Sequence, residues 1–364
     1  MDNLSFFKLL RLSIGISDER PTITGGKEWL QIYETAQKQA LVGVIHNGIQ
    51  QLEKSCQPPM ELALTWAVEA ETVHELNKLM NEEAARLTQL FKQEGRQTVI
   101  LKGQANAHLY PDPLSRQPGD IDIWVEGGRK SVIKLLKQMN LYDEEQAISY
   151  HHVHLPEVIE GITVEVHFRP SSGNCNPWTN RRLQRYLNEQ LAHITYYEKG
   201  FYEPPMTFAL AMQLAHIQRH FFSTGLGCRQ LMDYYFLLTH ASDEDRSKVT
   251  AILDRCGLRH IAGALMWVLQ YIFRLDDRLL LCPPDAYRGK WMLDEIMEGG
   301  NFGVFAERMT QSSDIVFFLK KEKRYFQLTR FDAPEMMGIQ LNYWKDLFRR
   351  IPERIKQRRF SLRK

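Results

Sequence analysis

Hydrophobic residues recur at helical spacing over the first 95 residues and again after residue 204. Leu4, Phe7, Leu10 and Ile14, for example, follow one face of a helix. Pro58-Pro59 and Glu94-Gly95 are typical start and stop signals for a long helix between them. The predicted helices cover residues 27–50, 59–94, 205–221, 227–240, 243–256, 258–274 and 285–298, with more up to about residue 360.

The stretch between these regions mixes alternating apolar runs with helical segments. Strands are predicted over 97–101, 120–125, 150–155 and 161–168, and helices over 104–110, 129–140 and 178–190. The pattern predicts an α+β fold, with a small mixed sheet flanked by N-terminal and C-terminal helical regions. The expected divisions are a helical region at 1–95, an α/β core at 96–200 and a helical domain at 201–364.

The most informative segment is residues 99–123, VILKGQANAHLYPDPLSRQPGDIDI. Side chains alternate between the two faces of a strand, so Asp120 and Asp122 point the same way while Ile121 and Ile123 point into the core. Two neighbouring carboxylates repel each other unless a cation lies between them. A hard divalent metal that carries a phosphate is the usual solution.

A third carboxylate follows the same pattern on a later predicted strand. In ITVEVHF (162–168), Ile162, Val164, Val166 and Phe168 share one face, and Glu165 lies on the other. If this strand lies beside the one that carries Asp120 and Asp122, Glu165 completes a three-carboxylate metal cluster. Such a cluster serves phosphoryl or nucleotidyl transfer with two metal ions.

These motifs resemble those of the polymerase-beta-like nucleotidyltransferase superfamily: a strand that ends in Gly, Asp-x-Asp on the next strand and a single acid on a later one. LKG, R-x-x-GDIDI and Glu165-Val-His167 resemble its bacterial branch of uncharacterised nucleotidyltransferases. The resemblance covers about residues 97–169, and more loosely the helical part with HIQRH and CRQLMDYYFLL. It implies that residues 96–200 are the nucleotidyltransferase core. Gln104 stands where relatives usually have a Ser that helps to hold the triphosphate, and the spacing from Gln104 to Asp120 is longer than usual.

Several other residues are candidates for binding a nucleotide. Gly103 lies where strand turns into helix, so its backbone can approach a phosphate, or it simply makes a tight turn. Lys102 and Arg116 are candidate phosphate cations, Arg116 by bidentate contact, although solvated basic side chains are common. Gln104 is a candidate for a side-chain contact with the nucleotide. His167 is expected to orient Glu165 or the nucleotide.

The histidines raise the possibility of zinc chemistry. His152 and His154 share a predicted strand face, and His216 and His220 share a helix face. No Glu follows His216, so the helix motif of metalloproteases is absent, and packed or hydrogen-bonded histidines are the more ordinary reading. Arg229 and Asp233, four residues apart on one helix, are expected to form an ordinary ion pair.

Composition constrains the remaining properties only weakly. A net charge of +2 across 364 residues favours no class of partner. The five cysteines show no regular spacing, which argues against a zinc site or a disulfide framework and favours a cytoplasmic protein. No apolar run is long enough for a membrane span, and the N-terminus lacks a signal-peptide pattern. The basic tail at 345–364 is expected to be a solvated helix, with nucleic-acid contact a less favoured alternative.

The sequence therefore predicts a metal-dependent nucleotidyltransferase, with Mg²⁺ or Mn²⁺ held by Asp120, Asp122 and Glu165. It would transfer a nucleoside monophosphate from a nucleoside triphosphate to an acceptor hydroxyl on a small molecule, a protein side chain or an RNA end, with release of pyrophosphate. The main alternative is a non-catalytic nucleotide-binding or protein-interaction module that keeps the fold. A zinc-dependent hydrolase that uses the histidines is a third hypothesis.

Overall fold

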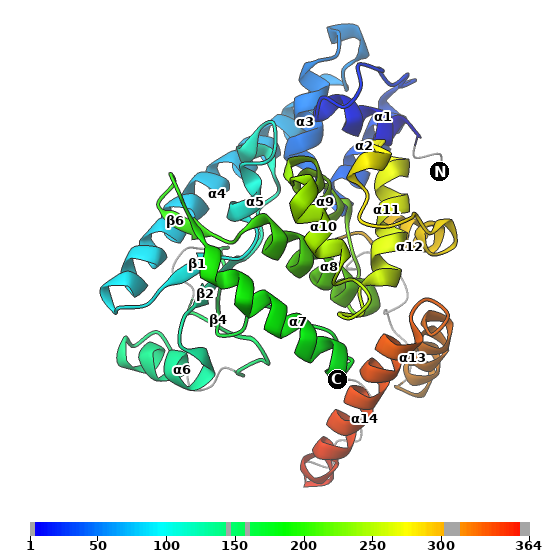
Figure 1. Ribbon diagram of the computed structural model, residues 1–364. Coiled ribbons are helices and arrows are strands. Elements are labelled where there is room, and N and C mark those ends of the chain that lie inside the picture. The colour runs from blue at the N-terminus through cyan, green and yellow to red at the C-terminus, as the bar shows by residue number, and fades with distance from the viewer. Residues whose placement is uncertain (1–3, 143–146, 157–160, 302–313, 357–364) are drawn as a thin grey trace.

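Figure 1 shows the computed structural model of the chain, in which helices surround a small sheet. The structure describes residues 4–142, 147–156, 161–301 and 314–356. The N-terminal helices lie at the top of this view, the sheet at the lower left, and the helices between residues 206 and 299 in the centre and at the right. No helix in the described part of the chain is long and apolar enough to cross a membrane.

The N-terminal region is helical, as expected, but it contains one more break than predicted. Its elements are α1 (Leu4–Ser13), α2 (Gly26–Lys38), α3 (Val42–Gln50), the short 3-10 helix η1 (Lys54–Cys56) and α4 (Met60–Gln93). The single helix predicted over 27–50 is wrong, because Ala40 takes a φ of +56° and ends α2. Leu41 is buried and directly follows Ala40, so the apolar pattern continues through the break and hides it.

Helix α4 matches the prediction for residues 59–94 closely. Gly95 has a φ of +69°, which a glycine adopts at little cost. The N–H groups of Gly95 and Arg96 return to the carbonyls of Lys92 and Phe91, as in a Schellman C-cap. The indole N–H of the fully buried Trp66 donates to the carbonyl of Val42 at 3.0 Å and ties α4 to α3.

The central sheet has the four predicted strands, each shorter than predicted: β1 (Thr98–Ile100), β2 (Ile121–Val125), β3 (His152–His154) and β4 (Val164–His167). Their order is β1-β2-β4-β3. The pairs β1–β2 and β3–β4 are antiparallel, whereas β2 and β4 run parallel. The sheet is therefore mixed, and the strand that carries Glu165 lies beside the strand that carries Asp122.

The two faces of the sheet have different partners. Ile121, Ile123 and Val166 form an apolar cluster with side chains of α4, such as Leu87, and of α6 (Gly128–Gln138), such as Leu136. The opposite face of β2 and β4 carries Asp122, Glu165 and His167. Because one face is fully used by the core, the alternation of the sequence fixes the register and turns all the polar groups to the other side.

Smaller elements connect the sheet to the rest of the molecule. Helix α5 (Gln104–Ala107) is one turn only, shorter than the predicted 104–110, and the 3-10 helix η2 (Pro113–Ser115) follows it. Helix α7 (Pro177–Gln190) agrees with prediction, and the 3-10 helix η3 (Leu191–His193) follows it. A separate hairpin of β5 (Thr195–Tyr197) and β6 (Phe201–Glu203) was not predicted. Its strands have three residues each, too few for alternation to be recognised.

The C-terminal region is helical, as predicted. Its elements are α8 (Met206–Phe222), α9 (Cys228–His240), α10 (Asp243–Thr250), α11 (Arg259–Phe273), the 3-10 helix η4 (Asp277–Leu279), α12 (Ala286–Gly299), α13 (Asp314–Leu328) and α14 (Ala333–Lys356). The prediction of a helix to residue 256 is wrong, because α10 ends at Thr250 and turns follow. Leu210 of α8 and Leu265 of α11 share an apolar cluster with Leu9 of α1 and Val44 of α3, so the two helical regions pack around one core.

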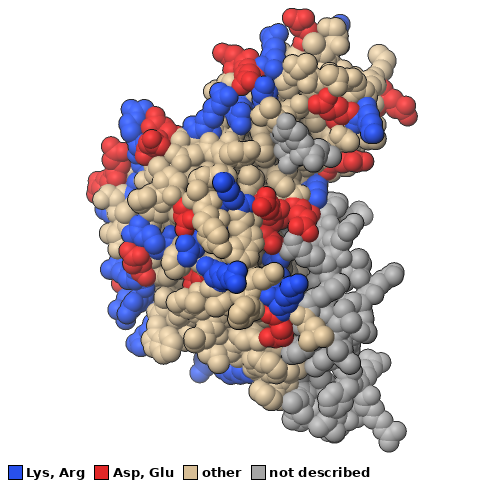
Figure 2. Space-filling view, turned by 90° about the vertical axis from the view of Figure 1, so that its right-hand side faces the viewer, with Lys and Arg blue, Asp and Glu red and all other residues tan. Residues whose placement is uncertain are grey.

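Charged side chains are dispersed on the face shown in Figure 2. Lys and Arg side chains lie among Asp and Glu side chains there, in keeping with the net charge of +2. A nucleic-acid-binding surface would instead be expected to gather basic side chains on one face. The visible face therefore adds no support for a nucleic-acid partner.

Candidate functional site

The site begins at the turn after β1, where Lys102 and Gly103 precede α5. Gly103 has a φ of +66°, in the region that favours glycine. A Cβ atom at Gly103 would lie 3.6 Å from the backbone oxygen of Asp120, so this turn passes close to the start of β2. The strand-to-turn arrangement expected at Gly103 is present, but the helix that follows is only one turn long.

The three predicted carboxylates lie on or next to two neighbouring strands. Asp120 directly precedes β2 and is exposed, whereas Asp122 is 1% exposed within the strand. Asp122 is the direct register partner of Glu165 in the parallel pair of β2 and β4. The nearby charges of Asp122 and Glu165 contribute, after burial, to a raised pKa of Asp120. The strand pairing required for a three-carboxylate cluster is therefore present.

Two cationic or proton-donating groups flank the buried Asp122. The Lys102 ammonium lies 2.9 Å from its Oδ2 atom, and Nε2 of His167 lies 3.1 Å from its Oδ1 atom. Burial opposes ionisation of Asp122, but the Lys102 charge and the His167 hydrogen bond outweigh it and hold the pKa of Asp122 well below its ordinary value. Asp122 is thus a stable carboxylate in a buried position.

His167 also bridges the two strands. Its Nε2 atom lies 3.2 Å from Oε2 of Glu165 in addition to the contact with Asp122. Although burial disfavours a charged imidazole, the hydrogen bonds to the two carboxylates raise the pKa of His167. The sequence predicted that His167 would orient Glu165 or the nucleotide, and this geometry allows it to orient both Asp122 and Glu165.

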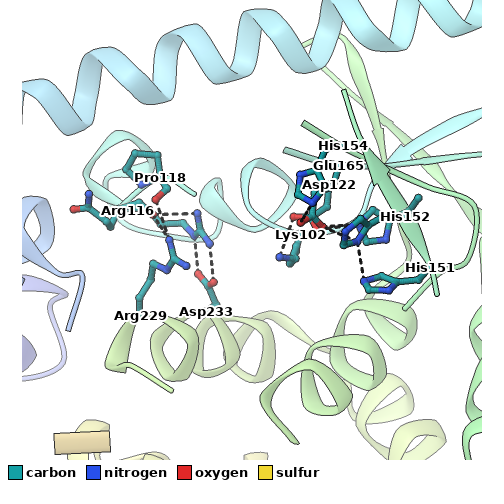
Figure 3. Close-up of polar contacts among 12 residues, drawn as sticks. Lys102, Arg116, Pro118, Asp122, His151, His152, His154, Glu165, Arg229 and Asp233 are labelled. Atoms are coloured by element: carbon teal, nitrogen blue, oxygen red, sulfur yellow. Dashed lines mark hydrogen bonds and ion pairs between the residues drawn. The ribbon is translucent and has the colours of Figure 1, made fainter. Parts of the chain in front are cut away.

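Strand β3 and the residue before it bring further imidazoles to Glu165. His152 Nδ1 lies 3.1 Å from Glu165 Oε2 and 3.0 Å from Nε2 of His151. Burial is the main cause that lowers the pKa of His151 to about 2, and it lowers that of His152 to about 4 against the Glu165 charge. His154 is more exposed, and its Nε2 atom is 3.9 Å from Glu165 Oε1. Figure 3 shows these side chains gathered around Glu165.

His216 and His220 lie one turn apart on α8, with their ring centroids 4.2 Å apart. Burial is the largest cause of the lowered pKa of both histidines, and the charge of Lys102 is the next largest. Together with smaller contributions they bring the pKa of His220 to about 4. The Arg219 charge contributes at His220 and also at His151. The α8 side chains therefore lie within electrostatic range of the sheet's polar face.

Arg116, predicted as a phosphate cation, forms an internal ion pair instead. The residue is 4% exposed, and its guanidinium donates from Nε and Nη2 to the two oxygens of Asp233 on α9, each at 2.8 Å. Figure 3 shows this pair apart from the carboxylates of the sheet. A buried bidentate ion pair leaves Arg116 unsuited to a phosphate contact, and we do not retain that role.

Gln104 is buried against α4 and has structural partners. Its amide donates to Asn77 at 3.2 Å and to Asn81 at 3.4 Å. Asn77 in turn donates to the carbonyls of Leu114 and Arg116 at 2.8 and 2.7 Å. Gln104 thereby supports the segment that leads to Asp120. The structure gives no direct support for a contact between Gln104 and a nucleotide.

Comparison with known families gives an independent result. The profile of a family described as uncharacterised nucleotidyltransferases matches residues 25–274. The chain belongs to this family. No curated protein and no solved structure gave a match. A nucleotidyltransferase uses a nucleoside triphosphate as its donor substrate, and such enzymes typically need a divalent metal.

The nucleotidyltransferase match covers the sheet, α8, α9 and every candidate residue described above. Sequence reasoning proposed the carboxylates, Lys102 and His167 as site residues, but it did not single out His151 or Arg219. The available signal for Arg219 was its spacing. Arg219 and His220 follow His216 by three and four residues, so both lie on the same helix face as His216. His151 fell inside the strand predicted over 150–155, where alternation placed it on the face opposite His152 and His154.

Proposed function

We propose that the chain is a metal-dependent nucleotidyltransferase that transfers a nucleoside monophosphate from a nucleoside triphosphate to an acceptor hydroxyl. The main support is the pairing of Asp122 with Glu165 across β2 and β4, with Asp120 directly before β2, in the part of the chain that matches the family. This arrangement offers several carboxylate oxygens on one face of a rigid sheet. The acceptor would be a small molecule, a protein side chain or an RNA end.

The donor set fits Mg²⁺ or Mn²⁺. Asp120, Asp122 and Glu165 offer hard oxygen ligands, which these ions prefer. The three carboxylates are near enough for the charges of Asp122 and Glu165 to affect Asp120, and a divalent ion would relieve their repulsion. When bound, the metal would neutralise the triphosphate and lower the barrier for attack by the acceptor oxygen.

The chain's own residues would divide the remaining tasks. Lys102 would place its ammonium against the phosphates, since it already lies 2.9 Å from Asp122 at the same face. Gly103 would let the backbone approach the phosphates without a side chain in the way. His167 would hold Asp122 and Glu165 in their relative positions through its two contacts. It would act as a positioning residue.

The transfer balances without a further reactant. The acceptor oxygen forms a bond to the α-phosphorus, the bond from that phosphorus to the bridging oxygen breaks, and pyrophosphate leaves. The acceptor proton passes to a carboxylate, for which Glu165 is the proposed base. Its Oε2 atom accepts hydrogen bonds from imidazoles, and the side chain is 15% exposed, so one edge remains open to a substrate.

Calorimetric titration with the four ribonucleoside triphosphates, with and without Mg²⁺, tests the proposal. The wild-type chain should bind at least one triphosphate in a Mg²⁺-dependent way, and Asp120→Asn/Asp122→Asn should lose that binding and all transfer of α-labelled nucleotide. Asp276→Asn serves as a matched control, because Asp276 is an exposed residue of a surface ion pair.

Thermal unfolding would establish that the double variant remains folded. Full transfer activity in a folded Asp120→Asn/Asp122→Asn chain would overturn the assignment. Equal nucleotide affinity with and without Mg²⁺, and with no transfer, would instead support a non-catalytic nucleotide-binding module.

A further inference from the structure

Three imidazoles and one carboxylate meet at the edge of the sheet, beside the proposed nucleotidyl-transfer site. His152 is the first residue of β3 and His151 directly precedes it, and Glu165 and His167 come from β4. One potential ligand atom from each of these four residues lies within 4.8 Å of all the others. We propose that this group, the His₃Glu cluster, binds one divalent transition-metal ion of the Zn²⁺ class. The proposal does not depend on nucleotidyl transfer.

The separations between the potential ligand atoms are those of a compact coordination shell. Glu165 Oε2 lies 3.1 Å from His152 Nδ1 and 3.2 Å from His167 Nε2. His151 Nε2 lies 3.0 Å from His152 Nδ1. Four ligands at tetrahedral positions around zinc, with bonds of about 2.0–2.1 Å, are about 3.3 Å from one another. Small side-chain rotations would therefore complete the shell.

Hydrogen bonds alone account poorly for this arrangement. His152 Nδ1 faces both a His151 nitrogen and a Glu165 oxygen, and the one proton it can carry cannot be shared well between them. The Nδ1 atoms of His151 and His167 are also buried, and no hydrogen-bond partner is found for them among the described residues. Binding of a cation would displace the proton that His167 Nε2 shares with the two carboxylates. With their protons on Nδ1, His151 and His167 would then each offer an Nε2 lone pair to the metal.

The ligand chemistry selects the class of ion. Imidazole nitrogen favours zinc, iron, nickel and copper, whereas magnesium prefers oxygen ligands throughout. The His₃Glu cluster is therefore expected to prefer a different metal ion from the one preferred by the Asp120 and Asp122 carboxylates. Glu165 could contribute to both sets, because its two oxygens face different neighbours: Oε2 faces His152 and His167, while Oε1 faces His154 at 3.9 Å.

Strand β3 supplies a matched control. His154 lies two residues beyond His152 and also near Glu165, but it is not one of the four residues of the cluster. Substituting His154 therefore changes the same kind of side chain on the same strand without removing a proposed ligand. Asp120→Asn is a second control, because it damages the proposed nucleotidyl-transfer site and leaves the four ligands intact.

The test is a titration of the chelator-treated full chain with Zn²⁺ by calorimetry, and with Co²⁺ by visible absorption as a report of coordination geometry. One Zn²⁺ should bind per chain. Because loss of an outer-shell partner alone costs 10–100-fold in metal affinity, His152→Gln and His151→Gln should each weaken binding by at least about 100-fold. His154→Gln and Asp120→Asn should bind within a few-fold of wild type.

The result that overturns the proposal is absence of stoichiometric Zn²⁺ binding, or binding that His151→Gln and His152→Gln leave unchanged in folded protein. These two residues are chosen because both are only partly buried, so their variants are expected to fold. Nucleotide titration of the same samples separates the two proposals. Absence of Zn²⁺ binding in protein that shows Mg²⁺-dependent nucleotide binding would reject the zinc site alone. Zn²⁺ binding in protein that shows no Mg²⁺-dependent nucleotide binding would reject only the transferase assignment.

Discussion

Arg116 and Asp233, 117 residues apart in the chain, form a bidentate ion pair in the interior of the protein. The hydroxyl of Tyr110 donates to the same carboxylate at 2.6 Å. Arg116 lies four residues before Asp120, whereas Asp233 belongs to α9. The pair therefore fastens the segment that leads to the candidate site to the C-terminal helical region.

Removing one partner of this pair should be strongly destabilising. Asp233→Asn leaves a buried guanidinium without a counter-charge, a change that typically costs about 3–5 kcal/mol of unfolding free energy. Urea denaturation of the variant measures the loss. Glu244→Gln, which removes an exposed ion pair with Lys248, should change stability far less. Equal effects of the two substitutions would contradict the structural role assigned to Arg116.

The same pair predicts how stability depends on pH. Burial opposes ionisation of Asp233, but Arg116 and the hydrogen bonds outweigh it and lower the pKa of Asp233 in the folded chain. A lowered carboxyl pKa contributes stability that is fully present above the unfolded value, about 3.9, and is lost as the pH falls through the folded value. The neighbouring Arg116, Arg229 and Tyr110 do not change charge in this range.

We therefore expect the stability difference between wild type and Asp233→Asn to stay constant from about pH 8 to pH 5 and to shrink below about pH 4. Urea midpoints at each pH measure it, and the common loss from other carboxyl groups cancels in the difference. A stability difference between wild type and Asp233→Asn that widens on acidification would show that Asp233 does not carry the stabilising charge.

The sequence predicted the sheet well because one physical pattern governs it. Alternation placed Ile121 and Ile123 in the core, and the same alternation turned Asp122 and Glu165 to the other face. This pattern is local, so a single strand reveals it. That β2 and β4 lie side by side could then be anticipated from the chemistry that both strands carry, whereas their parallel direction was not predicted.

Other features depend on contacts that no local pattern records. Arg116 was expected to bind phosphate. Local spacing could not reveal its actual partner, Asp233, which is on a helix more than a hundred residues away. The break at Ala40 was missed because the apolar pattern runs through it. His151 was placed inside the predicted strand 150–155, on the face opposite His152, whereas in the structure it directly precedes β3 and contacts His152. Each miss reflects tertiary packing that overrides a locally ordinary sequence.

Close packing of α3 against the segment before Asp120 gives another prediction. A Cβ atom at Gly43 would lie 2.5 Å from the backbone oxygen of Ser115, which cannot move without displacing the chain. Gly43→Ala should cost about 1–3 kcal/mol in unfolding free energy, measured by urea denaturation. Gly299→Ala is the matched control, because no atom of the residues that the structure describes lies within 4 Å of its added Cβ atom. A neutral Gly43→Ala would show that this contact is looser than described.

Arg229 supports the same segment from the other side. Its Nη1 atom donates to the carbonyls of Gln117 at 3.2 Å and Pro118 at 3.0 Å, directly before Gly119 and Asp120. A Cβ atom at Gly119 would lie 3.0 Å from that same nitrogen. Because a displacement of about 1 Å can cost about 100-fold in rate, Arg229→Gln should lower the proposed transfer activity by about 10–100-fold. Steady-state transfer of α-labelled nucleotide measures it.

A positioning role differs from a purely structural one in how the loss appears. If Arg229 holds Asp120 in place for metal binding, Arg229→Gln should raise the Mg²⁺ concentration needed for half-maximal transfer. Arg229→Lys, which keeps a donor, should raise this concentration less. The exposed Arg278, paired with Asp276, supplies the control variant Arg278→Gln. A fall in Arg229→Gln activity that follows the folded fraction alone, with the Mg²⁺ requirement unchanged, would assign Arg229 to stability rather than to positioning.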